Sequence, residues 1–179
     1  MLKYIRSLSF CFLAFFMLSE QDGCDGTHTP GPTSQSTTPP ALSWFLVLQT
    51  GDYQLVIEST NKISEQSPYY LEARLYLGIA RLAYGQSHNS QESLDSAVKD
   101  LLFVRDNFKL SNSLKQREQF LLYRALMVIT LISKPSNINQ ANGYLDQAVY
   151  FVKSNENLKK AVQEEYQEIY FNSDLRFEP

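Results

Sequence analysis

Two arginines, Arg74 and Arg81, carry the side chains best suited to ligand chemistry in this sequence. On a helix their spacing places them on one side, about two turns apart. A pair of guanidinium groups would form a clamp for a carboxylate of an acidic peptide segment or of a chain terminus. The alternative is structural, because arginine side chains also lie along apolar surface. An ion pair with Glu72 or Asp95 is the other structural possibility.

Other residue types offer less chemistry. The densest group of carboxylates, Glu164, Glu165 and Glu168, lies in a stretch rich in Lys and Gln, so we expect a solvent-exposed helix face and no acid–base pair. The two histidines, His28 and His88, fall in polar segments, and neither metal-ligand spacing, a phosphate-binding loop nor a nucleophile motif occurs. We therefore predict no cofactor, no metal site and no enzymatic activity.

The N-terminal 23 residues have the form of a secretory signal peptide or membrane anchor. Lys3 and Arg6 precede an apolar run, residues 8–18. That run is shorter than the roughly 20 residues of a membrane-spanning helix. A hydrophobic helix belonging to the fold is the alternative. Residues 24–39 follow as a segment rich in Pro, Ser and Thr, typical of a flexible linker.

A leader, a cysteine and a tether together resemble the start of a bacterial lipoprotein, and Cys24 stands at the corresponding position. Gly23 matches the small residue that this class has before its cysteine, whereas Gln21 and Asp22 depart from the pattern. The resemblance implies acylation of Cys24, and Asp25 directly after it would imply inner-membrane retention. We expect an exported protein on the periplasmic side of the cell envelope, held either by a lipid or by a retained leader.

The remainder of the chain, residues 40–171, has the composition of an all-α domain. The protein is 44% hydrophobic and contains 7 glycines and 7 prolines, with most prolines between Pro30 and Pro40. A scarcity of helix breakers favours helices. The formal net charge of −3 comes without a basic stripe, which argues against nucleic-acid binding.

Hydrophobic spacing predicts three helical hairpins. The first covers about residues 40–67: a helix over 41–49 that is apolar on nearly every side, a turn at Gly51, a cap at Asp52 and a second helix that Pro68 ends. The second hairpin begins at Tyr69 with a helix in which Gly78 lies at the close contact with the partner helix. A turn that begins at Gly85 follows this helix. A polar loop, residues 86–92, then precedes its partner helix.

The third hairpin pairs a long helix, about 113–133, with one over about 139–153. A final amphipathic helix over 156–171 has a polar outer face and would cap the stack. Residues 172–179 are expected to form a flexible tail.

The spacing of these hairpins resembles the tetratricopeptide repeat, a 34-residue helix–turn–helix unit. The resemblance implies an αα-hairpin superhelix of about three hairpins plus a C-terminal capping helix. Arg74 and Arg81 depart from it, because the family prefers aromatic residues there, and Val56 replaces an alanine. The matching positions are Gly51, Tyr53, Pro68, Leu77, Gly78 and Ala97.

In tetratricopeptide arrays the leading helix of each hairpin lines a concave groove that binds a protein segment. Carried over to this sequence, the resemblance implies a largely apolar groove that would accept an amphipathic helix or an extended peptide. The chain's own terminal helix is the competing occupant. Together with Arg74 and Arg81, the implied groove residues are Phe45, Leu48, Gln49, Glu72, Leu75, Ile79 and Leu82.

These observations predict a non-catalytic scaffold or adaptor of the cell envelope that binds a segment of another protein. It resembles the small tetratricopeptide lipoproteins that assist outer-membrane assembly, pilus biogenesis or secretion. The alternative is a structural subunit packed permanently into a larger envelope complex, without an exchangeable peptide. The partners expected are therefore a protein and, through the N-terminal leader or a lipid, a membrane.

Overall fold

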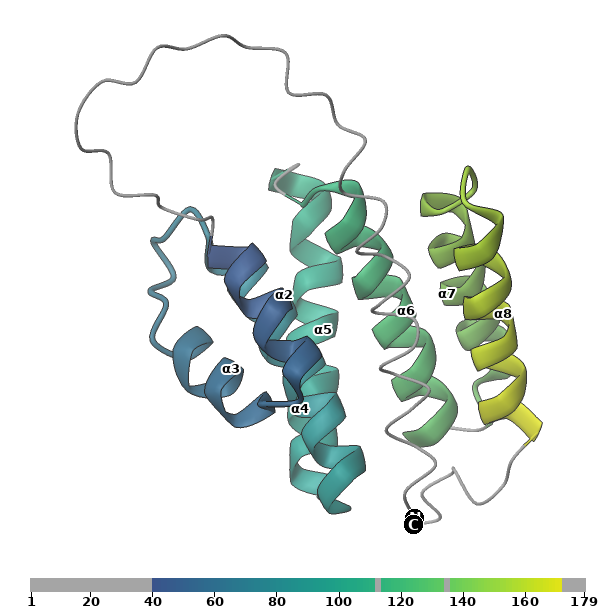
Figure 1. Cartoon of the computed structure of the whole chain (residues 1–179), viewed down its shortest axis with the longest axis horizontal. Coiled ribbons are helices and arrows are strands. Elements are labelled where there is room, and N and C mark those ends of the chain that lie inside the picture. Colours follow the sequence, from purple (N-terminus) through teal and green to yellow (C-terminus); the bar gives the residue numbers. More distant parts are fainter. Residues whose placement is uncertain (1–39, 112–113, 134–135, 172–179) are drawn as a thin grey trace, which may run out of the picture.

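The computed structural model describes residues 40–111, 114–133 and 136–171, and the protein is all-helical over these ranges. Within them, seven helices follow one another across the molecule, from α3 at one side to α8 at the other (Figure 1). Their bounds are α2 Pro40–Thr50, α3 Tyr53–Thr60, α4 Tyr70–His88, α5 Gln91–Ser111, α6 Gln116–Ser133, α7 Ile138–Phe151 and α8 Glu156–Phe171.

Helices that are consecutive in the sequence are packed against each other. The most extensive contacts join α4 with α5 and α6 with α7, and further contacts link α3 to α4, α5 to α6, and α8 to both α6 and α7. Two of the three predicted hairpins are thus tightly paired. The first pair, α2 and α3, is smaller, and both of its helices pack on α4.

The turn between α2 and α3 forms as the sequence predicts. Gly51 adopts a φ of 82°, a conformation that costs glycine little. Asp52 then caps α3, because its Oδ1 accepts a hydrogen bond from the backbone N–H of Leu55 at 3.1 Å. The bounds of the helix expected over 41–49 agree with α2 to within one residue at each end.

Helix α3 ends at Thr60, well before Pro68, so the prediction that the proline ends it was wrong. Beyond Thr60 the backbone forms short turns instead of a further helical turn. The N–H of Ile63 donates to the carbonyl of Thr60 at 3.1 Å, and the N–H of Ser67 donates to the carbonyl of Ser64 at 2.9 Å. Serine side chains add local bonds to this segment, since Ser67 Oγ accepts from the backbone N–H of Tyr69 at 3.2 Å.

Helix α4 is longer than predicted, and α4 and α5 together include most of residues 86–92, the segment that we expected to form a polar loop. It continues to His88, and the left-handed residue that ends it is Asn89, with φ 54° and ψ 42°. The carbonyl of Gly85 accepts hydrogen bonds from the N–H groups of Asn89 and Ser90, as in a helix C-terminal cap. Gly85 is therefore not the exit turn. It lies inside the helix, where a Cβ would come within 2.8 Å of Leu94 Cδ2.

Gly78 lies at the crossing of α4 and α5, as predicted. A Cβ at this position would lie 2.9 Å from Leu101 Cγ and 3.2 Å from Asp100 Cβ. The first distance is shorter than real Cβ contacts, and the second is tighter than most of them. The absence of a side chain at Gly78 thus allows α5 to approach α4 closely, and this approach positions Asp100.

Helix α6 is the centre of the core. From Phe120 to Ile132 every residue is buried. A helix that is apolar nearly all round must be covered on all sides, and α6 is in contact with α4, α5, α7 and α8. The two charged residues that it buries, Glu118 and Arg124, need partners within the protein.

Residues 1–39 and 172–179 lie outside the described residues, and so do the predictions that concern them: the signal peptide, acylation of Cys24, the linker and the tail. In the part of the chain that is described, none of the helices combines the length and hydrophobicity of a membrane span.

Candidate functional site

Arg74 and Arg81 of α4 converge on a single carboxylate, that of Asp100 on α5. Arg74 Nη2 lies 2.7 Å from Asp100 Oδ1, and Arg81 Nη1 lies 2.5 Å from Oδ2. The Asp100 side chain is only 2% exposed, whereas the arginine side chains are 30% and 25% exposed. This arrangement is the structural alternative, an ion pair within the chain, and a clamp for the carboxylate of a partner segment stays a prediction.

The partners expected for an ion pair were Glu72 or Asp95, and both were wrong. Asp100 takes this role because the close crossing at Gly78 brings its Cβ against α4, between the two arginines. Burial raises the pKa of Asp100 and the two guanidinium groups lower it, with burial the larger effect. One carboxylate facing two guanidinium groups leaves this group with an excess of one positive charge.

Two aromatic rings lie beside Arg74. The guanidinium carbon of Arg74 lies 5.9 Å from the ring centroid of Tyr70 and 5.4 Å from that of Phe103, within the range of cation–π attraction. Tyr70 and Phe103 meet edge to face at 6.0 Å. Phe103 is 37% exposed. We call the surface formed by Tyr70, Arg74, Arg81 and Phe103 the arginine–aromatic patch.

The apolar groove implied by the tetratricopeptide resemblance is not open in this structure. Its five apolar members lie in the hydrophobic core, because α2, α4 and α6 pack against one another at this place. Gln49 and Glu72 are half-buried. The buried members are Phe45, Leu48, Leu75, Ile79 and Leu82.

A second buried carboxylate, Glu118 of α6, lies beside the predicted groove. Its Oε1 accepts hydrogen bonds from Arg117 Nη2 at 2.6 Å and from the hydroxyl of Tyr76 at 3.3 Å. Its Oε2 is buried and has no hydrogen-bond partner. Burial, and then the negative charge of Glu118, raise the pKa of the half-buried Glu72.

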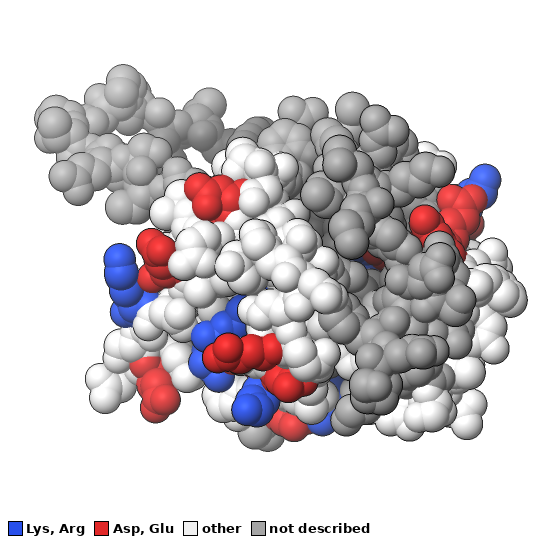
Figure 2. All heavy atoms as spheres, turned by 90° about the horizontal axis from the view of Figure 1, so that it is seen from below, with Lys and Arg blue, Asp and Glu red and all other residues white. Residues whose placement is uncertain are grey.

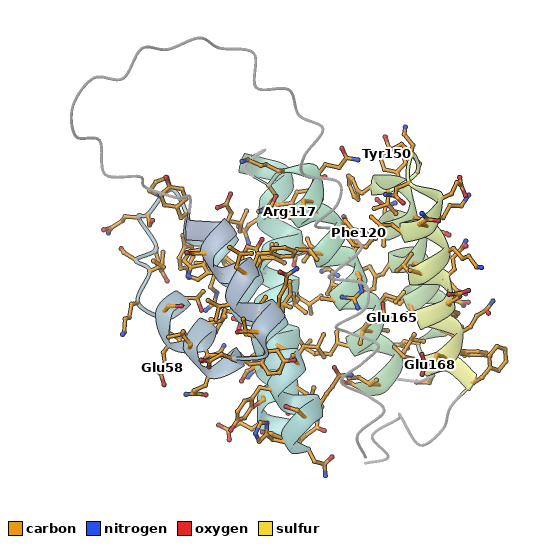
Figure 3. All side chains as sticks on the ribbon, viewed as in Figure 1. Glu58, Arg117, Phe120, Tyr150, Glu165 and Glu168 are labelled. Carbon is orange, nitrogen blue, oxygen red and sulfur yellow. The ribbon has the colours of Figure 1, made fainter. Side chains whose placement is uncertain are left out.

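A third buried carboxylate is Glu165 of α8, which we expected to be solvent-exposed. It lies between α6 and α8 (Figure 3) and accepts two hydrogen bonds from Arg124, at 2.7 and 2.6 Å. Both side chains are almost fully buried. Glu164 and Glu168 do lie on the exposed face, as expected. The trio therefore forms no joint acidic site.

A cavity of about 570 Å³ lies over α5, α6 and α7, at a place that the sequence did not single out. Tyr123 of α6 forms its floor, and Arg105 and Asp106 of α5 form one wall. The other wall is one face of α7, formed by Gln140, Gly143, Tyr144 and Gln147. The polar residues of this face recur at helical spacing, which is the signal by which sequence reasoning would have found it.

Among the residues that the structure describes, the other candidates for metal binding or catalysis do not come together. His88, expected in a loop, is the exposed last residue of α4, and its ring stacks on Tyr84 at 4.0 Å. Within residues 40–111, 114–133 and 136–171, no three His, Cys, Asp or Glu residues are placed to hold a metal ion. On the face drawn in Figure 2, basic and acidic side chains are interspersed.

Comparison of the chain with protein-family models, with curated proteins and with solved structures gave no match. What this protein does is therefore inferred from its own residues.

Proposed function

We propose that this protein is a non-catalytic adaptor whose helical body binds a segment of a partner protein through the arginine–aromatic patch. The observation that carries the proposal is the exposure of Phe103 beside Arg74, one of two arginines that together keep an excess positive charge. Tyr and Arg are among the residues that contribute most to binding energy at protein interfaces. In the patch, Asp100 holds both arginines, and Arg74 also lies against the rings of Tyr70 and Phe103.

The patch favours a segment that combines an acidic with an apolar residue. Asp100 uses one N–H group of each guanidinium, and a guanidinium has five. Because the two arginine side chains are partly exposed, some of their remaining N–H groups can bond to a further carboxylate, while Phe103 supplies apolar contact. This replaces the apolar groove as the binding surface, and the chemistry of the expected ligand, an acidic peptide segment, is kept.

The architecture proposed for this adaptor is a tetratricopeptide-like stack of αα-hairpins with α8 as the cap. Its support is the succession of paired helices and the close crossing of α4 and α5 at Gly78, the glycine of the Leu77-Gly78 pair. The position of α8 at one end of the series, against α6 and α7, is the one that a capping helix takes (Figure 1).

The proposed location is the periplasmic side of the cell envelope. The support comes from the sequence alone: the basic and apolar residues of the leader, Cys24 after Gly23, and the linker rich in Pro, Ser and Thr. An adaptor tethered in this way would work close to a membrane.

The alternative is a subunit held permanently in a larger envelope complex. Two exposed leucines, Leu46 at 40% and Leu55 at 47%, favour it, since they lie on the small pair α2 and α3 at one side of the molecule. A permanent interface would cover such residues.

Photo-crosslinking in intact cells tests the proposal. A photoreactive phenylalanine analogue replaces Phe103 in the patch, Leu46 on α2, or Tyr150, an exposed residue of α7 that serves as the control. The adaptor function predicts a discrete protein adduct at position 103 that competing partner peptide removes, and none at 150. An adduct at position 46 that resists competition, with none at 103, would instead support the permanent subunit.

A further inference from the structure

The cavity between α5 and α7 carries an incomplete set of hydrogen bonds. The hydroxyl oxygen of Tyr144 accepts a bond from Arg105 Nη1 at 2.8 Å and another from Gln140 Nε2 at 3.0 Å. A phenol oxygen has two acceptor positions and one proton. With both acceptor positions used, the hydroxyl proton of Tyr144 is left to donate, and Tyr144 lines the cavity. A ligand that completes this site must supply an acceptor.

The second polar group of the cavity, the Arg105 guanidinium, adds positive charge beside that proton. Tyr144 fixes one of its terminal nitrogens. Its other groups bond to Asp106, the next residue in the chain, at 2.8 Å from Nε and 2.7 Å from Nη2. The Asp106 side chain is 61% exposed. A pair so exposed is weak, because water screens it.

We infer that this cavity is a binding site for a carboxylate. The carboxylate would accept the Tyr144 hydroxyl proton and replace Asp106 on the Arg105 guanidinium, which matches carboxylates through paired N–H groups. The amide of Gln147, on the same face of α7, is placed along the wall for a group next to it. At about 570 Å³ the cavity has room for the end of a peptide.

Gly143 gives the site its open entrance. It lies within α7, and a Cβ built on it would meet no atom within 4 Å. A larger side chain at this position would therefore fill the cavity without disturbing the fold. The cavity shares no residue with the arginine–aromatic patch, so a side chain that fills it would leave the patch unchanged.

Three short peptides test the inference, each titrated into the protein while its amide resonances are followed by NMR. They are acetyl-tetraalanine with a free terminal carboxylate, the same peptide as its carboxamide, and a carboxamide form with one alanine replaced by glutamate. The free-carboxylate peptide or the glutamate peptide should shift the resonances of Gly143 and Tyr144. The plain carboxamide should bind at least about tenfold more weakly, because the charge-assisted bonds are lost.

Two variants of the protein sharpen the test. Gly143→Leu should abolish the shifts without lowering the melting temperature, because leucine has a higher helix propensity than glycine. Asp106→Asn should tighten binding about fivefold at low salt, because it removes the competing carboxylate and its like charge. Shifts elsewhere in the protein serve as the internal control.

Binding of the free-carboxylate peptide would identify a chain terminus as the source of the carboxylate, and binding of the glutamate peptide would identify an acidic side chain. Either outcome supports the inference. Equal binding of the carboxamide would overturn it, and so would binding that Gly143→Leu leaves intact. Weaker carboxylate binding by Asp106→Asn would also overturn it, since the inference requires the opposite sign.

Discussion

The guanidinium group of Arg124 and the carboxylate of Glu165 face each other through two hydrogen bonds, Nε to Oε2 at 2.7 Å and Nη2 to Oε1 at 2.6 Å. The pair joins α6 to α8, and its side chains are 4% and 3% exposed. Removal of one member of a buried ion pair leaves a charge in a poorly solvated place. The attachment of the last helix should therefore depend on this contact.

Glu165→Ala tests that dependence. We expect it to lower the free energy of unfolding by about 3 kcal/mol, the lower end of the range for breaking a buried pair. Glu164→Ala is the matched control: Glu164 is the preceding residue, and its ion pair with Lys160, at 3.6 Å, is exposed to solvent. Chemical denaturation followed by circular dichroism measures both. Equal losses for the two variants would show that the bidentate pair is energetically unimportant.

Gly78→Ala should destabilise the crossing of α4 and α5. The new methyl group would lie 2.9 Å from Leu101 Cγ and 3.2 Å from Asp100 Cβ, so the helices must separate or Leu101 must move. Overpacking of this kind costs about 1–3 kcal/mol.

Gly143→Ala provides the matched helical control for Gly78→Ala. Its Cβ meets nothing within 4 Å, and the gain in helix propensity should stabilise the protein by up to about 1 kcal/mol. Thermal unfolding of the two variants should thus shift in opposite directions. A fall in stability for both would mean that the space at Gly143 is not open in solution.

Arg74 and Arg81 stabilise the fold as well as forming part of the patch. The double substitution of both by alanine removes the two cations that face the buried Asp100, and we expect a loss of about 3 kcal/mol or more. Arg74→Ala alone should cost less than half as much, since Arg81 remains on the carboxylate. Denaturant titration of the wild type and the two variants checks this order. A double variant as stable as the wild type would mean that Asp100 stays solvated in solution.

The exposed ring of Phe103 therefore separates binding from stability better than the arginines do. Phe103→Ala loses an edge-to-face contact with Tyr70, worth about 0.5–1.5 kcal/mol of stability. We expect the crosslinked partner to bind at least about tenfold more weakly, which corresponds to about 1.4 kcal/mol. Tyr150→Ala, on α7, is the control and should leave partner binding unchanged.

The first turn and the crossing of α4 and α5 were predictable from the types and positions of single residues. Gly51 and Asp52 mark the first turn through their own backbone and immediate neighbours, and Gly78 marks the helix crossing because a position without a side chain lets α5 approach. The end of α3 was missed because short turns between Thr60 and Ser67 replace the helix before Pro68 is reached. Local competition of this kind depends on side-chain conformations that a sequence pattern does not contain.

The buried carboxylates were harder to predict, although each one lies in an apolar stripe. Glu165 falls between Val162 and Ile169, three residues after one and four before the other, and both are buried. Asp100 has the same spacing from Ala97 and Val104, also both buried. The pattern alone would have placed both acids in the core. What it could not supply was the arginine that each one meets, because the ion pairs join different helices.

Cys24→Ser tests the proposed attachment to the envelope. If Cys24 carries a lipid, the variant should lose incorporation of a labelled fatty acid and move from the membrane to the soluble fraction. Cys11→Ser is the control, because Cys11 lies within the apolar run of the leader and should not matter for acylation. Unchanged labelling in Cys24→Ser would exclude acylation at this residue.

Glu72 should make the stability of the protein depend on pH. Burial, followed by the charge of Glu118, raises the pKa of Glu72 above its usual value of 4.5. Between pH 4.5 and the raised pKa, the folded state binds more protons than the unfolded state. The free energy of unfolding therefore falls as the pH rises through this window and stays lower above it.

Glu72→Gln should remove this contribution. It should raise the melting temperature at pH 7 and leave it almost unchanged at about pH 4, below the window. Glu168→Gln, at an exposed position of α8, is the control and should keep the wild-type pH dependence. A lower melting temperature for Glu72→Gln at pH 7 would mean that the Glu72 carboxylate is stabilised in the folded protein, which is incompatible with a raised pKa.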